Sequence, residues 1–358
     1  MPTIITRGAA SAKAFGFGFI GGKVFSFSTP AKMNGSSVYA TMQSVTVNSS
    51  GLFVAVGYDT NAYPIYATSS NGSTWTTPAK MNGSSVYATM QSVTVNSSGL
   101  FVAVGNTVNT YPLYATSSNG TTWTTPAKMN GSSTVANMLS VTVNSSGLFV
   151  AVGFDTNNYP LYATSTNGST WTTPALMNGS STVANMWAVT VNSSGLFVAV
   201  GFDGNSYPLY ATSSNGSTWT TPTLMNGSTT TATMRAVTVN SSGLFVAVGY
   251  TNSGYPVYAT SSNGSTWTTP ATINGSTTIA FMYSVAVNSS GLFVAVGYDT
   301  NSYPVYATSS NGSTWTTPAL MNGSTTVAYM QGVTVNSSGL FVAIGSNVAG
   351  SPLYSISN

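Results

Sequence analysis

A 48-residue repeat runs through almost the whole chain and constrains its fold more than any other feature of the sequence. The string GLFVAVG or its variant GLFVAIG occurs once in each copy and begins, at a constant spacing, at Gly51, Gly99, Gly147, Gly195, Gly243, Gly291 and Gly339. Repeats of 20 to 50 residues are typical of solenoids, propellers and arrays, in which each unit is one supersecondary structure. The sequence therefore predicts a fold built from near-identical units.

Each unit contains four short extended segments separated by turn residues. In the first complete unit these segments are Ser44–Asn48, Leu52–Val56, Pro64–Thr68 and Thr74–Thr77. They are rich in Val, Thr, Tyr, Phe and Trp, alternate between apolar and polar residues, and are joined by NSSG and SSNG, which are typical turn sequences. No window has helical periodicity, so we expect four strands per unit and an all-β protein.

Four strands in 48 residues match the size of one blade of a β-propeller. The second segment, Leu52–Val56, is apolar on both faces, as expected for a strand covered by a neighbouring blade on each side. The fourth segment is rich in Thr and is followed by Pro78, which suits an outer edge strand that need not donate hydrogen bonds. We therefore expect an antiparallel β-propeller.

The two ends of the chain carry complementary fragments of one unit. Ser351–Asn358 aligns with Tyr63–Ser70, so the last unit lacks its fourth strand, whereas Val24–Pro30 aligns with that missing strand. We predict a seven-bladed ring over residues 24–358, closed by pairing of Val24–Thr29 with Pro352–Ser355. A linear solenoid would not require the fragments to be complementary.

The composition excludes most kinds of catalytic and metal site. The chain has no His and no Cys, its only acids are four Asp, its only Arg are Arg7 and Arg235, and charged residues make up 3%. General acid–base catalysis needs neighbouring titratable groups, and zinc sites need His or Cys. The net charge of +3 comes from few groups, which disfavours binding to nucleic-acid phosphates. We predict a protein that is not an enzyme and has no cofactor or metal.

The turn TSSNGSTW at Thr68–Trp75 resembles the Asp-box of sialidase-type propellers, whose pattern is Ser-x-Asp-x-Gly-x-Thr-Trp. Gly72 and Thr74 match the pattern, as does the Trp, whereas Thr68 and Ser70 stand at its Ser and Asp positions. The Trp position recurs at Trp123, Trp171, Trp219, Trp267 and Trp315, with Phe27 in the N-terminal strand.

This resemblance implies a structural turn, in which the Trp is buried and the Asn-Gly residues satisfy their own backbone. It does not imply sialidase activity, which uses an arginine cluster, a Tyr nucleophile and acids, because this chain has two Arg and no Glu. The architecture is also similar to that of repetitive propeller lectins, which carry small sugar sites within or between blades.

Two segments differ from copy to copy while the turns between them stay constant. Before the first strand, Ala40 and Met42 recur in every unit, but the residue after the Met varies: Gln43, Gln91, Leu139, Trp187, Arg235, Tyr283 and Gln331. The preceding alternate position also varies: Thr41, Thr89, Asn137, Asn185, Thr233, Phe281 and Tyr329. Period-2 alternation indicates an extended segment with one packed side and one free, variable side.

The second variable segment follows the second strand, as in Tyr58–Ala62, and contains every acid of the chain: Asp59, Asp155, Asp203 and Asp299. The loop into strand one and the loop from strand two to strand three lie at the same end of an antiparallel blade. We therefore expect one variable face that includes Phe202–Ser206 and exposes Trp187, Arg235 and Tyr283. Drift in tolerant loop tips is the alternative explanation.

The variable face predicts ligand recognition, and we expect the ligands to be glycans. Trp187 and Tyr283 supply an apolar platform, and Arg235, Asp203 and Asn205 supply hydrogen bonds, with Tyr58, Gln43, Gln91 and Gln331 as further candidates. Several weak sites on one face would act together through avidity. Of two recurrent tyrosine rows, we expect the Tyr63 row to be able to stack on a sugar and the Tyr66 row to pack between blades.

Residues 1–23 do not repeat and are expected to form an N-terminal arm. The segment is rich in Gly and Ala, is interrupted by Lys13, and lacks the apolar stretch of a membrane span or a signal peptide. It resembles N-terminal stretches of some phage and virus structural proteins. We predict an adhesion protein of a virion or cell surface, outside the cell. The alternative is a structural decoration or adaptor protein anchored to a protein partner by this arm.

Overall fold

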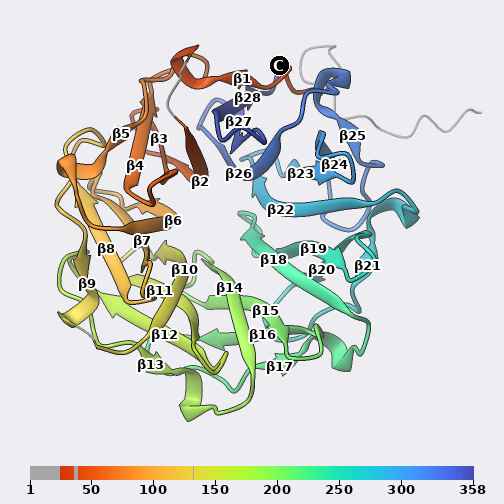
Figure 1. Cartoon of the computed structure of the whole chain (residues 1–358). Helices are drawn as coiled ribbons and strands as arrows, with labels where there is room; N and C mark the ends of the chain where they lie inside the picture. The colour runs from red at the N-terminus through yellow and green to blue at the C-terminus, as the bar shows by residue number, and fades with distance from the viewer. Residues whose placement is uncertain (1–24, 36–38, 132) are drawn as a thin grey trace, which may run out of the picture.

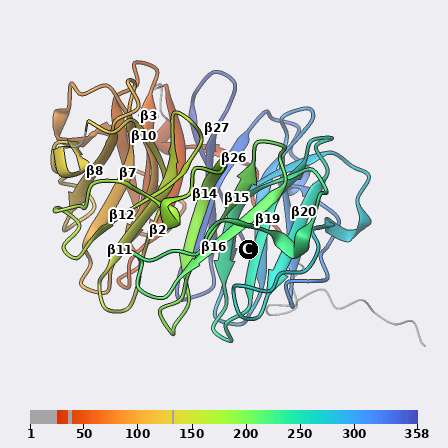
Figure 2. The same cartoon turned by 90° about the horizontal axis from the view of Figure 1, so that it is seen from below.

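The described residues form seven four-stranded antiparallel sheets arranged around a central axis (Figure 1). The computed structural model describes residues 25–35, 39–131 and 133–358. Seen from the side, the sheets stand as the blades of a thick disc (Figure 2). The seven-bladed propeller predicted from the repeat is confirmed.

The four strands of a blade run from the axis to the rim. The innermost strands are β2 (Ala40–Val47), β6 (Ala88–Val95), β10 (Ala136–Val143), β14 (Ala184–Val191), β18 (Ala232–Val239), β22 (Ala280–Val287) and β26 (Tyr329–Val335). The second strands are β3 (Phe53–Asp59), β7 (Phe101–Thr107), β11 (Phe149–Asp155), β15 (Phe197–Asp203), β19 (Phe245–Thr251), β23 (Phe293–Asp299) and β27 (Phe341–Ser346).

The two outer positions are occupied by shorter strands. The third strands are β4 (Pro64–Ser69), β8 (Pro112–Ser117), β12 (Pro160–Ser165), β16 (Pro208–Ser213), β20 (Pro256–Ser261), β24 (Pro304–Ser309) and β28 (Pro352–Ile356). The fourth strands are β5 (Ala79–Lys80), β9 (Ala127–Lys128), β13 (Ala175–Leu176), β17 (Thr223–Leu224), β21 (Ala271–Thr272), β25 (Ala319–Leu320) and β1 (Ala31–Lys32). Single 3₁₀ turns follow the fourth strands, the first being η1 (Met33–Gly35).

Two strand boundaries differ from those predicted. The innermost strand begins at Ala40 rather than Ser44, so the first variable segment lies within a strand and not in a loop. The fourth strand is Ala79–Lys80 rather than Thr74–Thr77. The N–H of Thr68 donates to the hydroxyl of Thr76 and not to a backbone carbonyl, and Pro78 has no N–H to donate. Regular pairing with the third strand therefore begins only after the proline, at Ala79.

The ring closes as the terminal fragments predicted, but a few residues further along the chain. Ala31 and Lys32 of β1 pair with Tyr354 and Leu353 of β28, and a single bridge joins Phe27 to Ser357. The predicted pairing residue Val24 lies outside the described residues. The closing strand lies beside the last blade at the top of Figure 1.

The apolar core lies between blades as well as within them. Phe53 and Ala55 of β3 pack in one cluster with Val342 and Ile344 of the last blade. Val54, the residue between them, packs in the next cluster with Phe101 of the following blade. Each second strand therefore has both faces buried by neighbours, which explains why it is apolar throughout.

The turn that resembles an Asp-box is a structural turn. Trp75 is 2% exposed, and its Nε1 donates to the carbonyl of Gly72 at 2.8 Å. Asn71 Oδ1 accepts from the backbone N–H groups of Ser73 and Thr74. The predicted burial of the Trp and satisfaction of the turn are confirmed. The oxygen comes from Asn71, one residue after the Asp position of the pattern, so the Asp-box relationship remains a resemblance.

The Tyr66 row packs between blades, as predicted. The Tyr66 ring lies 6.1 Å from that of Trp123 in the next blade, and its hydroxyl donates to the Thr121 carbonyl. The same contact repeats around the ring, for example between Tyr210 and Trp267 at 6.1 Å.

Replacing the buried closing aromatic should weaken the ring. Phe27 is 1% exposed and packs against Tyr306 and the last-blade cluster. We expect Phe27→Ala to lower the free energy of unfolding by about 3–5 kcal/mol, because it removes a large buried ring and leaves a cavity. Thermal denaturation measures the effect, with Ser49→Ala in an exposed turn as the control. Equal melting temperatures for the two variants would contradict this closure.

Replacing a turn tryptophan should affect stability and leave recognition intact. Trp219 is 3% exposed and its ring lies 6.3 Å from that of Tyr162 in the preceding blade. We expect Trp219→Ala to cost about 3–5 kcal/mol of unfolding free energy, measured by chemical denaturation. A variant of unchanged stability that had lost ligand binding would reverse this assignment.

Candidate ligand-binding site at the propeller axis

The first variable row forms a β-bulge in every blade. The pairing of β2 with β3 shifts between Met42 and Ser44, which leaves Gln43 as the extra residue. The same shift leaves Trp187 unpaired in β14 and Arg235 unpaired in β18. A bulge redirects the side chain of its extra residue. The seven variable residues therefore occupy equivalent positions at the inner edge of the blades.

A glycine in the second strand makes room for each bulge. A Cβ atom on Gly201 would collide with the backbone carbonyl of Asn185, just before Trp187, and Gly57 faces Thr41 in the same way. Glycine allows this close approach of two strands because it has no side chain. The glycine at the end of the GLFVAVG string therefore allows the bulge that orients the variable residue.

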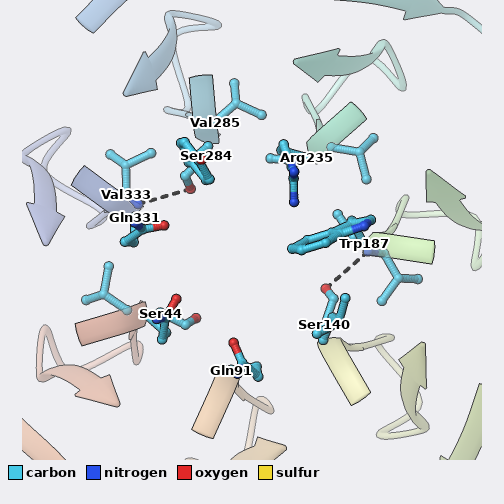
Figure 3. Close-up of a pocket in the computed structure, with 18 residues that line it drawn as sticks. Ser44, Gln91, Ser140, Trp187, Arg235, Ser284, Val285, Gln331 and Val333 are labelled. Carbon is cyan, nitrogen blue, oxygen red and sulfur yellow. Dashed lines mark hydrogen bonds between the residues drawn. The ribbon is translucent and has the colours of Figure 1, made fainter. Parts of the chain in front are cut away.

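The seven bulges converge on one cavity of about 180 Å³ at the axis. Figure 3 shows Trp187, Arg235, Gln91 and Gln331 pointing from four blades toward its centre. Gln43, Leu139 and Tyr283 complete the variable lining. The sequence predicted a variable face with several separate sites, whereas the structure brings the first variable row together in one place.

Arg235 lies at the centre of an aromatic environment. Its guanidinium carbon is 3.8 Å from the centroid of the Trp187 ring, and within 5.7 Å of the centroids of Phe202, Tyr250 and Tyr283. Its Nη2 donates to the Tyr250 hydroxyl at 2.6 Å. Cations bind to aromatic faces in this geometry, most strongly to Trp, so the guanidinium is held in place.

The rings around Arg235 belong to a longer aromatic arc that spans five blades. We define the arc as Phe154, Trp187, Phe202, Tyr250, Phe281, Tyr283, Tyr298 and Tyr329. Neighbouring rings lie 4.9–6.5 Å apart, and Arg235 connects Phe202 to Tyr250. Trp187 and Phe202 are stacked at 19°, as are Tyr283 and Tyr298 at 17°. Of the arc, Trp187 and Tyr283 line the axial cavity, and the other rings pack around them.

Tyr250, Tyr283 and Tyr298 share hydrogen bonds, and the last two stay protonated. The hydroxyls of Tyr283 and Tyr298 lie 2.9 Å apart, and those of Tyr250 and Tyr283 lie 3.5 Å apart. Burial, reinforced by these neighbours, raises the pKa of Tyr283 well above its usual value, and burial raises the pKa of Tyr298. Both side chains are therefore neutral hydrogen-bonding groups at physiological pH.

The other side of the site is lined by amides. Gln331, Gln43 and Gln91 come from three consecutive blades, across the ring closure. Gln91 Nε2 donates to Thr89 Oγ1 at 3.1 Å, which leaves its carbonyl oxygen toward the cavity as drawn in Figure 3. The site thus combines an aromatic wall, one cation and several neutral hydrogen-bonding groups.

The four Asp have a local structural role that the sequence analysis did not anticipate. Asp59 Oδ1 accepts from the backbone N–H groups of Asn61 and Tyr63, and Asp203 Oδ1 accepts from those of Asn205 and Tyr207. Asp155 and Asp299 repeat the arrangement. These carboxylates cap the loops, and the described residues contain no ion pair between them and Arg235. A role in ligand binding remains a prediction.

The two variable segments lie at the same end of the disc, as the contact between Arg235 and Tyr250 requires. The expectation that Trp187, Arg235 and Tyr283 would be exposed was wrong: each is partly buried, because side chains from seven blades crowd at the axis. Asn205 is exposed at a loop tip, and Tyr58 and Phe202 are partly buried. At this end of the disc, the loop tips are therefore exposed to solvent, whereas the side chains at the axis are partly buried.

Outside the axis, Tyr63 contacts protein groups. Its ring stacks on that of Tyr87 at 5.0 Å, and the ammonium of Lys80 lies 3.5 Å from its centroid. Stacking of this row on a sugar remains a prediction.

The sequence analysis missed most of the aromatic arc. Phe154, Tyr250 and Tyr298 belong to the same row as Tyr58, and Phe281 and Tyr329 belong to the row of Thr41, which had been noted as variable. Thr41 pairs with Tyr58 across the two strands, so the two rows are neighbours. Their joint enrichment in aromatics in the later blades was the available signal.

Within the described ranges, no cluster of three or more acidic, His or Cys side chains could hold a metal ion. No helix in that part of the chain is long and apolar enough to cross a membrane.

Solved structures of other proteins share this fold. The virginiamycin B lyase of Staphylococcus aureus, in an inactive variant with quinupristin, has a TM-score of 0.69 and 8% identity over 93% of this chain and 99% of the lyase. A lectin of Burkholderia pseudomallei has a TM-score of 0.67 and 11% identity over 87% and 94% of the two chains. YCF48 of Cyanidioschyzon merolae has a TM-score of 0.64 and 14% identity over 92% and 98%.

No family model matches the chain. No curated protein matches its sequence. At these identities the structural similarity establishes the seven-bladed propeller, which hosts both enzymes and binding proteins, and leaves function to the site itself.

Filling the space opposite a bulge should disturb the site. We expect Gly201→Ala to cost about 1–3 kcal/mol of unfolding free energy, because the new methyl group forces the strands around Trp187 apart. Gly204→Ala is the matched control, since its Cβ would lie 3.4 Å from Val183 Cγ1, an ordinary contact. Differential scanning calorimetry compares the two, and equal melting temperatures would show that the bulge does not depend on the glycine.

Proposed function

We propose that the protein is a non-catalytic recognition or adhesion protein that binds a glycan at the propeller axis. The observation that carries this proposal is the convergence of Trp187, Arg235, Tyr283 and three glutamines on one cavity. Small-molecule sites are typically concave, lined by aromatic and apolar groups, and equipped with a few polar groups that fix orientation. A sugar offers complementary surfaces, with apolar ring faces and a periphery of hydroxyls.

The cavity volume favours binding of one sugar unit at the end of a glycan. Its volume of about 180 Å³ is smaller than the roughly 300–1,000 Å³ of pockets for drug-sized ligands. The exposed loop tips around it, such as Gly204–Asn205, are then available to the next units. Since the seven blades build one axial site, avidity would require several propellers on one surface, and a single weak site would bind with Kd of about 1 mM.

A binding role is favoured over catalysis by the chemistry of the lining. The cavity lining contains one cation, neutral amides, Ser and Tyr, with no carboxylate or His beside them. General acid–base chemistry at neutral pH needs a group that titrates there, and the pKa of Tyr283 is shifted away from that range. The lectin among the structural neighbours is consistent with this proposal, although the virginiamycin B lyase shares the fold.

The proposed location is the outside of a virion or cell. The support is compositional: charged residues make up 3% of the chain, and Ser, Thr and Asn supply most of its polar surface. The competing proposal is a decoration or adaptor protein held in an assembly by residues 1–23, which lie outside the described residues.

A triple substitution in the axial site tests the proposal. We expect Trp187→Ala with Arg235→Ala and Tyr283→Ala to abolish binding to a glycan array and to host cells, because it removes the platform and the cation together. The matched control is Ser193→Ala with Ser241→Ala and Ser289→Ala, three exposed turn residues at the opposite end of the same blades.

The two proposals give different outcomes in this test. Glycan binding by the parent and the control, but not by the triple variant, supports the axial site. Equal binding by all three proteins would exclude it. If the parent binds no glycan and copurifies with a particle through residues 1–23, the adaptor proposal replaces it.

A further inference from the structure

The guanidinium of Arg235 has no anionic partner in the described part of the chain, although all four Asp lie within it. One carboxylate oxygen of each Asp accepts backbone hydrogen bonds in a loop cap, as in Asp203 with Asn205 and Tyr207. Arg235 Nε is buried without a hydrogen-bond partner. A partly buried cation with an unsatisfied N–H group is costly, so a strong anionic acceptor would be favoured here.

The arginine is also fixed in orientation before any ligand arrives. The Trp187 ring lies 3.8 Å from the guanidinium carbon, and the Tyr250 hydroxyl accepts from Nη2 at 2.6 Å. Figure 3 shows the side chain extending toward the open centre beside Trp187. An arginine held in this way loses little freedom on binding, which makes its remaining N–H donors more effective.

Arg235 supplies the charge of the axial site. Of the residues that line the cavity, it alone is charged, and the neighbouring Tyr283 and Tyr298 are neutral. The apolar arc lowers the local polarity around it, which strengthens electrostatic attraction compared with bulk water. The site is therefore a cationic spot surrounded by aromatic rings.

We propose that the sugar bound at the axis is acidic, and that its carboxylate or sulfate ester pairs with the guanidinium of Arg235. This inference rests on the proposed glycan-binding function and adds the charge of the ligand to it. The planar fork of N–H groups in arginine matches two oxygens of such an anion. Trp187 would contact the sugar beside the guanidinium that covers one face of its ring, and Gln91 and Gln331 would bond to the sugar hydroxyls from the opposite wall.

The experiment compares matched glycans that differ in charge. The probes are immobilised oligogalacturonate, the same oligomer after methyl esterification of its carboxylates, sialyllactose, lactose, and lactose bearing a sulfate ester. Binding of the full chain is measured by surface plasmon resonance. We expect the carboxylated or sulfated members to bind and their neutral counterparts to bind at least about 10-fold more weakly. The response of the two acidic classes tells carboxylate from sulfate.

Variants of Arg235 test whether this side chain binds the anionic group of the glycan. We expect Arg235→Gln to weaken acidic-glycan binding by about 10- to 100-fold, and Arg235→Lys to weaken it less, because lysine keeps the charge and loses the fork. The matched control is Lys80→Gln, which removes a cation stacked on Tyr63, outside the axial cavity. Melting temperatures show that each variant is folded.

Each outcome either supports the inference or overturns it. Charge-selective binding that Arg235→Gln abolishes and Lys80→Gln preserves supports it. Equal binding of neutral and acidic glycans, or charge selectivity that survives in Arg235→Gln, overturns it and leaves glycan recognition standing. Absence of binding to every glycan overturns this inference together with the proposed function.

Discussion

The structure depends on the packing of each blade against the next. The second strand of every blade is buried on both faces, with Phe53 and Ala55 against one neighbour and Val54 and Val56 against the other. No blade can satisfy this strand alone, so the ring must be complete before every apolar face is covered. The N-terminal segment meets that requirement, since Phe27 fills the last cluster and Ala31–Lys32 completes the last sheet.

Because the core is formed between the blades, the residues at their inner edge can vary. Ala40 and Met42 anchor the innermost strand in the core, while the bulge at Gln43 turns its side chain toward the axis. Gly57 and its equivalents in the other blades make room for the bulged backbone, and the side chain of the bulged residue points away from them. Residues as different as Leu139, Trp187 and Arg235 therefore fit the same backbone. A repetitive scaffold can thus present a non-repetitive site without loss of core packing.

The proposed binding site and the stability of the ring consequently depend on different rows of residues. The turn tryptophans, the Tyr66 row and the loop-capping aspartates hold the blades and loops in place. Trp187 and Tyr283 of the aromatic arc line the cavity at the axis together with Arg235 and the glutamines. This division explains why an arginine could be placed among aromatic rings without a carboxylate beside it: the proposed partner is the ligand.

The fold and the identity of the variable positions can be derived from the amino-acid sequence alone. The repeat length, the turn sequences and the complementary ends specify seven four-stranded blades and their closure, because strand patterning and turn chemistry are local properties. That Trp187, Arg235 and Tyr283 line one cavity is visible only in the folded ring, since residues 48 positions apart become neighbours only when the ring closes around its axis. That the aspartates cap loops and that the fourth strand follows Pro78 are likewise visible only there, because both depend on which backbone groups lie within hydrogen-bonding distance.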